Sequence, residues 1–128
     1  MMVSNLTPAM RTLLRLEALL VLILSVAIYH YQHYSGWLFA GCFLLPDISF
    51  IAYALGKKAG ALGYNIAHSY IGPILCGLVF VWLQQPFWLM AALIWCAHIG
   101  FDRTLGYGLK YAEGFGYTHL GRLNNKQR

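Results

Sequence analysis

Charged side chains are what this sequence most conspicuously lacks. Asp, Glu, Lys and Arg together make up 10% of its 128 residues, whereas hydrophobic residues make up 59%. An average soluble domain is roughly one quarter charged. The deficit excludes an ordinary soluble domain and indicates an integral membrane protein, for which membrane lipids are the expected surroundings.

Other features are missing as well. The three cysteines, Cys42, Cys76 and Cys96, show no CxxC spacing and lie in apolar stretches, which argues against zinc ligation and disulfides. The formal net charge is +5, but the basic residues are scattered at segment ends rather than gathered into a patch, so no nucleic-acid partner is expected. No internal repeat or linker divides the chain, and we expect a single domain over residues 1–128.

Four apolar stretches fill most of the chain. Each is close to the roughly 20 residues that an α-helix needs to cross a bilayer. The connections between them are short, so neighbouring helices should run antiparallel. The sequence therefore predicts an all-α, four-helix transmembrane bundle. The expected spans cover residues 12–31, 36–55, 60–83 and 86–107, and a tail rich in glycine and aromatic residues follows at 108–128.

Lysine and arginine are distributed unevenly around these spans. Arg11 and Arg15 precede the first span, Lys57 and Lys58 lie in the second connection, and further basic residues follow the fourth span. The other two connections contain neither residue type. By the positive-inside rule, both termini of this multi-pass protein face the cytoplasm. We expect the tail to cap the cytoplasmic mouth of the bundle. His119 could fold back as a further ligand or proton shuttle, and a solvated or hydrogen-bonded surface histidine is the favoured alternative.

Ionisable side chains inside the apolar spans are the strongest pointer to function. Asp47, His68, His98 and Asp102 all lie there, and such groups are unfavourable in hydrocarbon unless they are paired, hydrated or bound to a metal. Counting 1.5 Å per residue from the cytoplasmic lysines puts them roughly 12 to 18 Å deep, in one layer. His98 and Asp102, four residues apart, also share a helix face. We therefore predict one shared site.

The residue types in this layer indicate a metal. Imidazole nitrogen and carboxylate oxygen are usual ligands of zinc, iron or manganese ions, so we expect Asp47, His68, His98 and Asp102 to bind a divalent metal ion that activates water. Glu17 or Asn65 would orient that water or act as a base, and Arg103 would meet an anionic headgroup. This hypothesis describes a metal-dependent membrane hydrolase, or a related metalloenzyme, acting on a lipid or other amphipathic substrate from the cytoplasmic side.

Two alternative functions remain open. The buried groups also suit a small transporter or proton/ion pathway, working as a homo-oligomer because four short helices enclose little volume. Such a pathway needs polar residues that continue into the outer half of the bundle. The same groups also suit a structural or accessory subunit. In that case each carboxylate pairs with a histidine, or Asp102 with Arg103, only to hold the helices together.

Short motifs around the candidate ligands resemble a known family. The order LLPDIS (44–49), AHSY (67–70) and AHIGFD (97–102) resembles the motif order of bacterial inner-membrane proteins described as membrane-bound metal-dependent hydrolases. The resemblance implies that the aspartates and histidines within these motifs are the metal ligands. It also implies a location in the bacterial inner membrane.

A closer similarity covers nearly the whole chain. The stretches GALGYNIAH (60–68), AHIGFDRTLGYGLKY (97–111) and THLG (118–121) are similar to a family of small bacterial four-helix membrane proteins whose function is not assigned. This similarity implies the helical bundle and singles out the tail, but it implies no activity.

Overall fold

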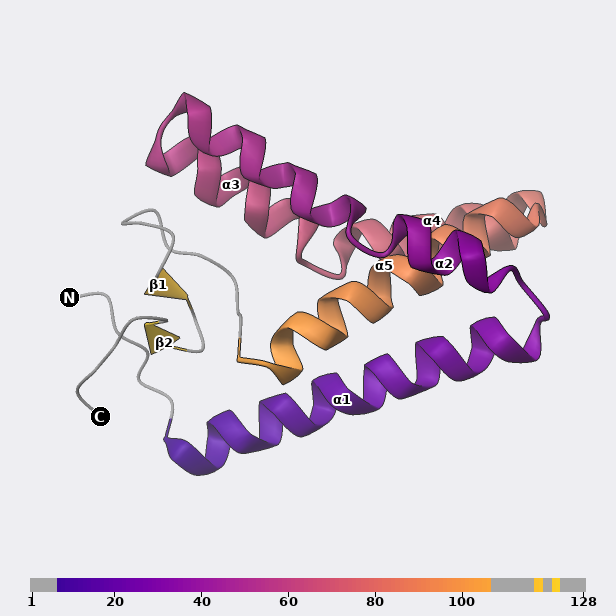
Figure 1. The fold of residues 1–128 in the computed structure, drawn as a ribbon, viewed down its shortest axis with the longest axis horizontal. Coiled ribbons are helices and arrows are strands. Elements are labelled where there is room, and N and C mark those ends of the chain that lie inside the picture. Colours follow the sequence, from indigo (N-terminus) through magenta and orange to yellow (C-terminus); the bar gives the residue numbers. More distant parts are fainter. Residues whose placement is uncertain (1–6, 107–116, 119–120, 123–128) are drawn as a thin grey trace.

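The computed structural model describes residues 7–106, 117–118 and 121–122. These residues are almost entirely helical, apart from one short antiparallel pair of strands (Figure 1). The expected tail, with His119, lies mostly outside the described residues. The elements are α1 (Pro8–Tyr31), α2 (Gly36–Cys42), the 3₁₀ helix η1 (Leu45–Leu55), α3 (Lys57–Ala67), α4 (Ile71–Leu83), α5 (Pro86–Thr104), β1 (Tyr117–Thr118) and β2 (Gly121–Arg122).

Three helical stretches are long and apolar enough to span a membrane, judged by length and composition: Pro8–Tyr31, Gly36–Leu55 and Lys57–Leu83. Much of their apolar surface faces outward. On α1, for example, Leu20 and Leu24 are exposed. So large an outward apolar surface is stable against lipid and costly in water. The described chain therefore has the surface of a membrane protein.

The fourth expected span, α5, is not among these three stretches. Its second half carries three polar residues, His98, Asp102 and Arg103. It is also the helix with the largest set of buried residues in the described chain, including Ala97, Ile99 and both neighbours of Ile99. α5 is the helix against which α1 and α4 pack, whereas η1 and α3 pack mainly on each other.

The first helix begins at Pro8, ahead of the expected span 12–31, and Thr7 and Pro8 form its start. The Thr7 hydroxyl accepts a hydrogen bond from the Met10 backbone N–H at 3.0 Å. Pro8 is the first helical residue, where a backbone N–H would have no partner within the helix, so a residue without an N–H fits there. α1 then runs alongside α5 (Figure 1). The two backbones approach closely at Gly100, where a Cβ would lie 2.8 Å from the Ala18 carbonyl oxygen. Glycine at this position is therefore required for the observed packing.

The expected span 36–55 is not one continuous α-helix, which corrects the prediction. Its α-helical part ends at Cys42, and it continues as the 3₁₀ helix η1. The physical reason is Pro46, which has no N–H to donate and whose ring would clash with the carbonyl four residues earlier, that of Cys42.

The expected span 60–83 is broken in the same way. α3 ends at Ala67 and α4 begins at Ile71, with three non-helical residues between them. Pro73 accounts for the break, because it removes the hydrogen bond to the Ser69 carbonyl. In the first turn of α4 its missing N–H costs nothing, since those N–H groups have no partner within the helix.

η1 and α3 form a tight hairpin. Gly56 makes the turn between them with a φ of 118°, a backbone conformation that residues other than glycine rarely adopt. Gly60 then packs against the Tyr53 ring, and a Cβ on Gly63 would lie 2.7 Å from that of Ala52. In Figure 1 this hairpin extends toward one end of the molecule, whereas α2 and α4 lie toward the other. The breaks at the junctions α2–η1 and α3–α4 therefore lie in the middle of the molecule.

Candidate metal centre

The four predicted ligands occupy the broken ends of two spans and one face of α5. Asp47 lies in the first turn of η1, directly after Pro46. His68 is the first residue after α3. His98 and Asp102 are one turn apart on α5 and project from the same face of that helix. The two breaks thus bring Asp47 and His68 beside α5.

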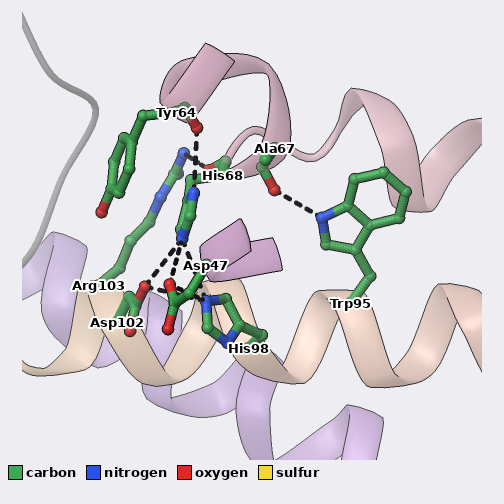
Figure 2. A network of polar contacts seen from close by, with 8 residues as sticks. All are labelled: Asp47, Tyr64, Ala67, His68, Trp95, His98, Asp102 and Arg103. Carbon is green, nitrogen blue, oxygen red and sulfur yellow. Dashed lines mark hydrogen bonds and ion pairs between the residues drawn. The ribbon is translucent and has the colours of Figure 1, made fainter. Parts of the chain in front are cut away.

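The ligand atoms of these residues converge on one point (Figure 2). His68 Nε2 and His98 Nε2 lie 3.1 Å apart. Asp47 Oδ1 is 3.2 Å from His68 Nε2 and 3.1 Å from His98 Nε2. Asp102 Oδ2 is 3.2 Å from the Nε2 atom of each histidine. The four atoms all lie within 4.8 Å of one another, so this group could hold a metal ion.

The distances suit a small metal ion. Five of the six separations among the four atoms are 3.1 to 3.2 Å, close to the spacing between ligand atoms around a tetrahedral zinc ion with bonds of about 2 Å. A divalent ion there would contact two neutral imidazoles and two carboxylates, whose charges it would offset. The donor set is thus compatible with zinc, iron or manganese, and it does not discriminate among them.

The tautomer of His68 strengthens the case for a cation. His68 Nδ1 lies 3.0 Å from the Tyr64 backbone oxygen, which can only accept, so the imidazole N–H donates there. In a neutral ring, Nε2 then carries a lone pair. This lone pair faces oxygens of Asp47 and Asp102 and the Nε2 of His98. A cation at the centre of the four atoms would interact favourably with all of them at once. A single proton on one of these atoms cannot form hydrogen bonds to all the others.

Burial divides the four residues into three enclosed ligands and one open one. The side chains of His68, His98 and Asp102 are 4%, 1% and 16% exposed, whereas that of Asp47 is 36% exposed. Aromatic rings close the histidine side. The Tyr64 ring stacks on His68 with the centroids 3.9 Å apart, and the Phe43 ring meets His98 edge-on. Water or substrate would therefore reach the centre from the side of Asp47.

Two side chains of α5 hold the break that positions His68. Trp95 Nε1 donates to the Ala67 carbonyl at 2.6 Å, and Arg103 Nη2 donates to the His68 carbonyl at 3.3 Å (Figure 2). Carbonyls at a helix end have no partner within the helix, so these bonds replace the missing ones. Arg103 thus donates to the backbone at this break. Asp102 lies within ion-pair distance of both histidines.

The residues that support the ligands were not predicted from the sequence. Tyr64 lies four residues before His68, and Trp95 lies three before His98. Helical spacing places each of them on the same face as the ligand it precedes. That spacing was the available signal, although it does not distinguish a supporting aromatic side chain from one that faces lipid.

The three predicted catalytic helpers are not part of the cluster itself. Glu17 is exposed on α1 and lines a small cavity of about 130 Å³ together with Tyr70 and Arg103. The Arg103 guanidinium lies over the Tyr70 ring, 4.9 Å from its centroid. Asn65 is half-buried on α3, three residues before His68. Their catalytic roles remain predictions.

The fold and the site together define a class: a helical membrane protein with a buried aspartate–histidine cluster that could hold a metal ion. A family model described as "Domain of unknown function (DUF4260)" matches residues 11–123, so the chain belongs to this family. Comparison with curated proteins finds no match, and comparison with solved structures finds none. The predicted membership of a family of unassigned function is confirmed, and it brings no activity with it.

Proposed function

We propose that this protein is a metal-dependent membrane hydrolase acting on a lipid or other amphipathic substrate from the cytoplasmic side. One observation carries the proposal. Two imidazole nitrogens and two carboxylate oxygens from three separate segments lie within 4.8 Å of one another in a chain whose helices are apolar enough to span a membrane. Ionisable groups at such a depth are by default functional, because they are costly to keep there.

The proposed architecture is four antiparallel spans, with α5 as the fourth. In Figure 1 the start of α1, the η1–α3 turn and the end of α5 lie toward the same end of the molecule. Arg15, Lys57 and Lys58 belong to that end, which supports placing it in the cytoplasm. The motif resemblance to bacterial inner-membrane proteins supports that membrane as the location.

The chain's own residues would divide the catalytic work as follows. His68, His98 and Asp102, the enclosed ligands, would hold a divalent ion, which when bound would polarise a substrate oxygen and activate water. Asp47, the most exposed of the four, would complete the site, orient the incoming water and accept its proton. Glu17 and Asn65 remain candidates for the same task.

Arg103 is the proposed contact for an anionic headgroup. The guanidinium has five N–H donors, of which one reaches the His68 carbonyl. The side chain also lines the small cavity that Glu17 borders. A phosphate bound there would receive charge-assisted hydrogen bonds close to the metal centre.

The surroundings of the cluster support an enzyme over a transporter. An ion pathway needs polar groups that continue toward the outer half of the bundle. On the side of the cluster toward the start of α5, the space is lined by apolar residues such as Leu45, Ile94 and Trp95. This lining favours an apolar ligand rather than a hydrated ion.

Elemental analysis of full-length protein purified without chelator tests the proposal. We expect about one zinc, iron or manganese ion per chain, by the ligand count of a single site. The His98→Ala variant should lose this metal, whereas the control His30→Ala, at the exposed end of α1, should retain it. Vesicles containing the loaded protein should release a lipid hydrolysis product, and chelation should abolish the release. Absence of stoichiometric metal from the wild-type protein would overturn the proposal.

A further inference from the structure

We infer that one fatty acyl chain of the substrate lipid occupies an apolar cavity beside the metal centre. The inference rests on the proposed function and names its substrate class, an acylated membrane lipid. The cavity has a volume of about 410 Å³ and lies between α2, the start of η1 and the first half of α5. Its walls include Leu38, Cys42, Leu45, Met90, Ala91 and Ile94.

The cavity adjoins the metal centre on three elements. On η1, the cavity residues Pro46 and Ser49 flank Asp47. On the third span, the cavity residue Ala67 directly precedes His68. A molecule bound in the cavity would therefore have one end beside Asp47 and His68, the two metal-binding residues that come from the broken spans.

The third element, α5, joins cavity and centre along a single helix face. Ala91, Ile94 and Trp95 line the cavity, and His98 and Asp102 follow at the spacing that keeps side chains on one face. The cavity thus lies one to two helical turns from the centre, toward the beginning of α5. A chain lying along this face would have one end at the cluster and its remainder in the apolar space.

An acyl chain fits the chemistry of the walls. The volume lies within the range of small-molecule pockets, and the lining is almost wholly apolar, so a sugar or a nucleotide would lose hydrogen bonds on entering. Leu38, Leu45 and Phe87 are exposed at its rim on helices that would face lipid, which gives a chain lateral entry from the bilayer. Because hydrocarbon around the protein is as apolar as the cavity, the cavity would position the chain rather than supply most of the affinity.

One polar residue, Ser49, belongs to the part of the cavity wall that η1 contributes, two positions after Asp47. Ser49 Oγ is buried, and within the described part of the chain it has no hydrogen-bond partner. A buried hydroxyl without a partner is unfavourable. If the Ser49 side chain rotates toward the cavity that the residue lines, its hydroxyl would donate a hydrogen bond to the ester carbonyl of an acyl lipid, which follows directly on the apolar chain. This contact would place the ester beside Asp47, two residues before Ser49, with the chain pointing away from the centre.

Photocross-linking tests the inference on the full-length, metal-loaded protein. The probe is a phosphatidylcholine with a diazirine in the middle of one acyl chain, mixed into vesicles of ordinary phosphatidylcholine. We expect peptide mapping to find cross-links concentrated on α5 between Phe87 and Trp95. The Ala91→Trp variant fills the cavity and should lose them. The matched control Ala40→Trp, at an exposed α2 position outside the lining, should keep them.

A second variant and a second measurement keep the outcomes separate. Cys42→Phe narrows the cavity from the α2 wall and should also lose the cross-links, which covers a failure of Ala91→Trp to fold. Metal content is measured on the same samples. Cross-links that are spread evenly over α1 and α4, or that are unchanged in a folded Ala91→Trp variant, would overturn the inference. In that case the proposed function would still stand, provided that the wild-type protein contains metal. A metal-free wild type would instead overturn the proposed function.

Discussion

Removing the metal should destabilise the protein, because the metal would hold together segments that are far apart in the sequence. The cluster joins η1, the end of α3 and the second half of α5 through four ligand atoms. A ligand that binds only the folded state stabilises it by about 2.7 kcal/mol when its concentration is 100 times its dissociation constant. At that metal concentration we expect a chelator to lower the unfolding free energy by about this amount.

The assay is thermal unfolding of the detergent-solubilised protein, followed with and without chelator and after metal is added back. The wild-type melting temperature should fall on chelation and recover with zinc, iron or manganese. The His68→Ala variant should show neither change, because it lacks one enclosed ligand. A purely structural cluster needs no metal, since each carboxylate would simply pair with a histidine. A wild-type melting temperature that chelation leaves unchanged, in protein shown to contain metal beforehand, would refute the metal-centred reading.

Three further predictions separate the roles of individual residues. Asp47→Asn should retain metal yet lose lipid hydrolysis, whereas Asp102→Asn, at a more enclosed ligand, should lose metal by elemental analysis. Trp95→Phe leaves the carbonyl at the α3 end without its donor, so denaturant titration should show a loss of about 1 to 3 kcal/mol. Gly100→Leu should cost about 1 to 3 kcal/mol by forcing α1 from α5, whereas Gly77→Leu, with open space around it, should melt like the wild type.

Length and composition were sufficient to identify three stretches that are long and apolar enough to span a membrane, whereas the fourth expected span is not among them. The first expected span, 12–31, ends where α1 ends, and Pro86 marks the start of α5 as predicted. These boundaries follow from local rules, because an apolar run must satisfy its backbone hydrogen bonds internally in lipid. The same rules did not predict the two breaks. Pro46 and Pro73 are visible in the sequence, but a proline in a membrane helix can produce either a kink or a full interruption.

Packing on α5 accompanies the full interruption at the third span. There, Trp95 and Arg103 donate to the two carbonyls left at the end of α3. The two donors lie on α5, 28 and 35 residues further along the chain than the carbonyls that they bind. No local pattern around Pro73 therefore reveals them. Their helical spacing to His98 and Asp102 becomes informative only once α5 is known to lie against the break.

The sequence alone determined that the chain is apolar enough for a membrane and that Asp47, His68, His98 and Asp102 lie within its apolar segments at similar depth. Depth follows from counting residues along a helix, and it specifies one coordinate of each side chain. Tertiary structure decided the others: the rotation of each helix, the breaks that bring Asp47 and His68 to α5, and the exposure of Asp47. Those depend on contacts between segments distant in sequence, because side-chain packing sets how helices are rotated and placed against one another.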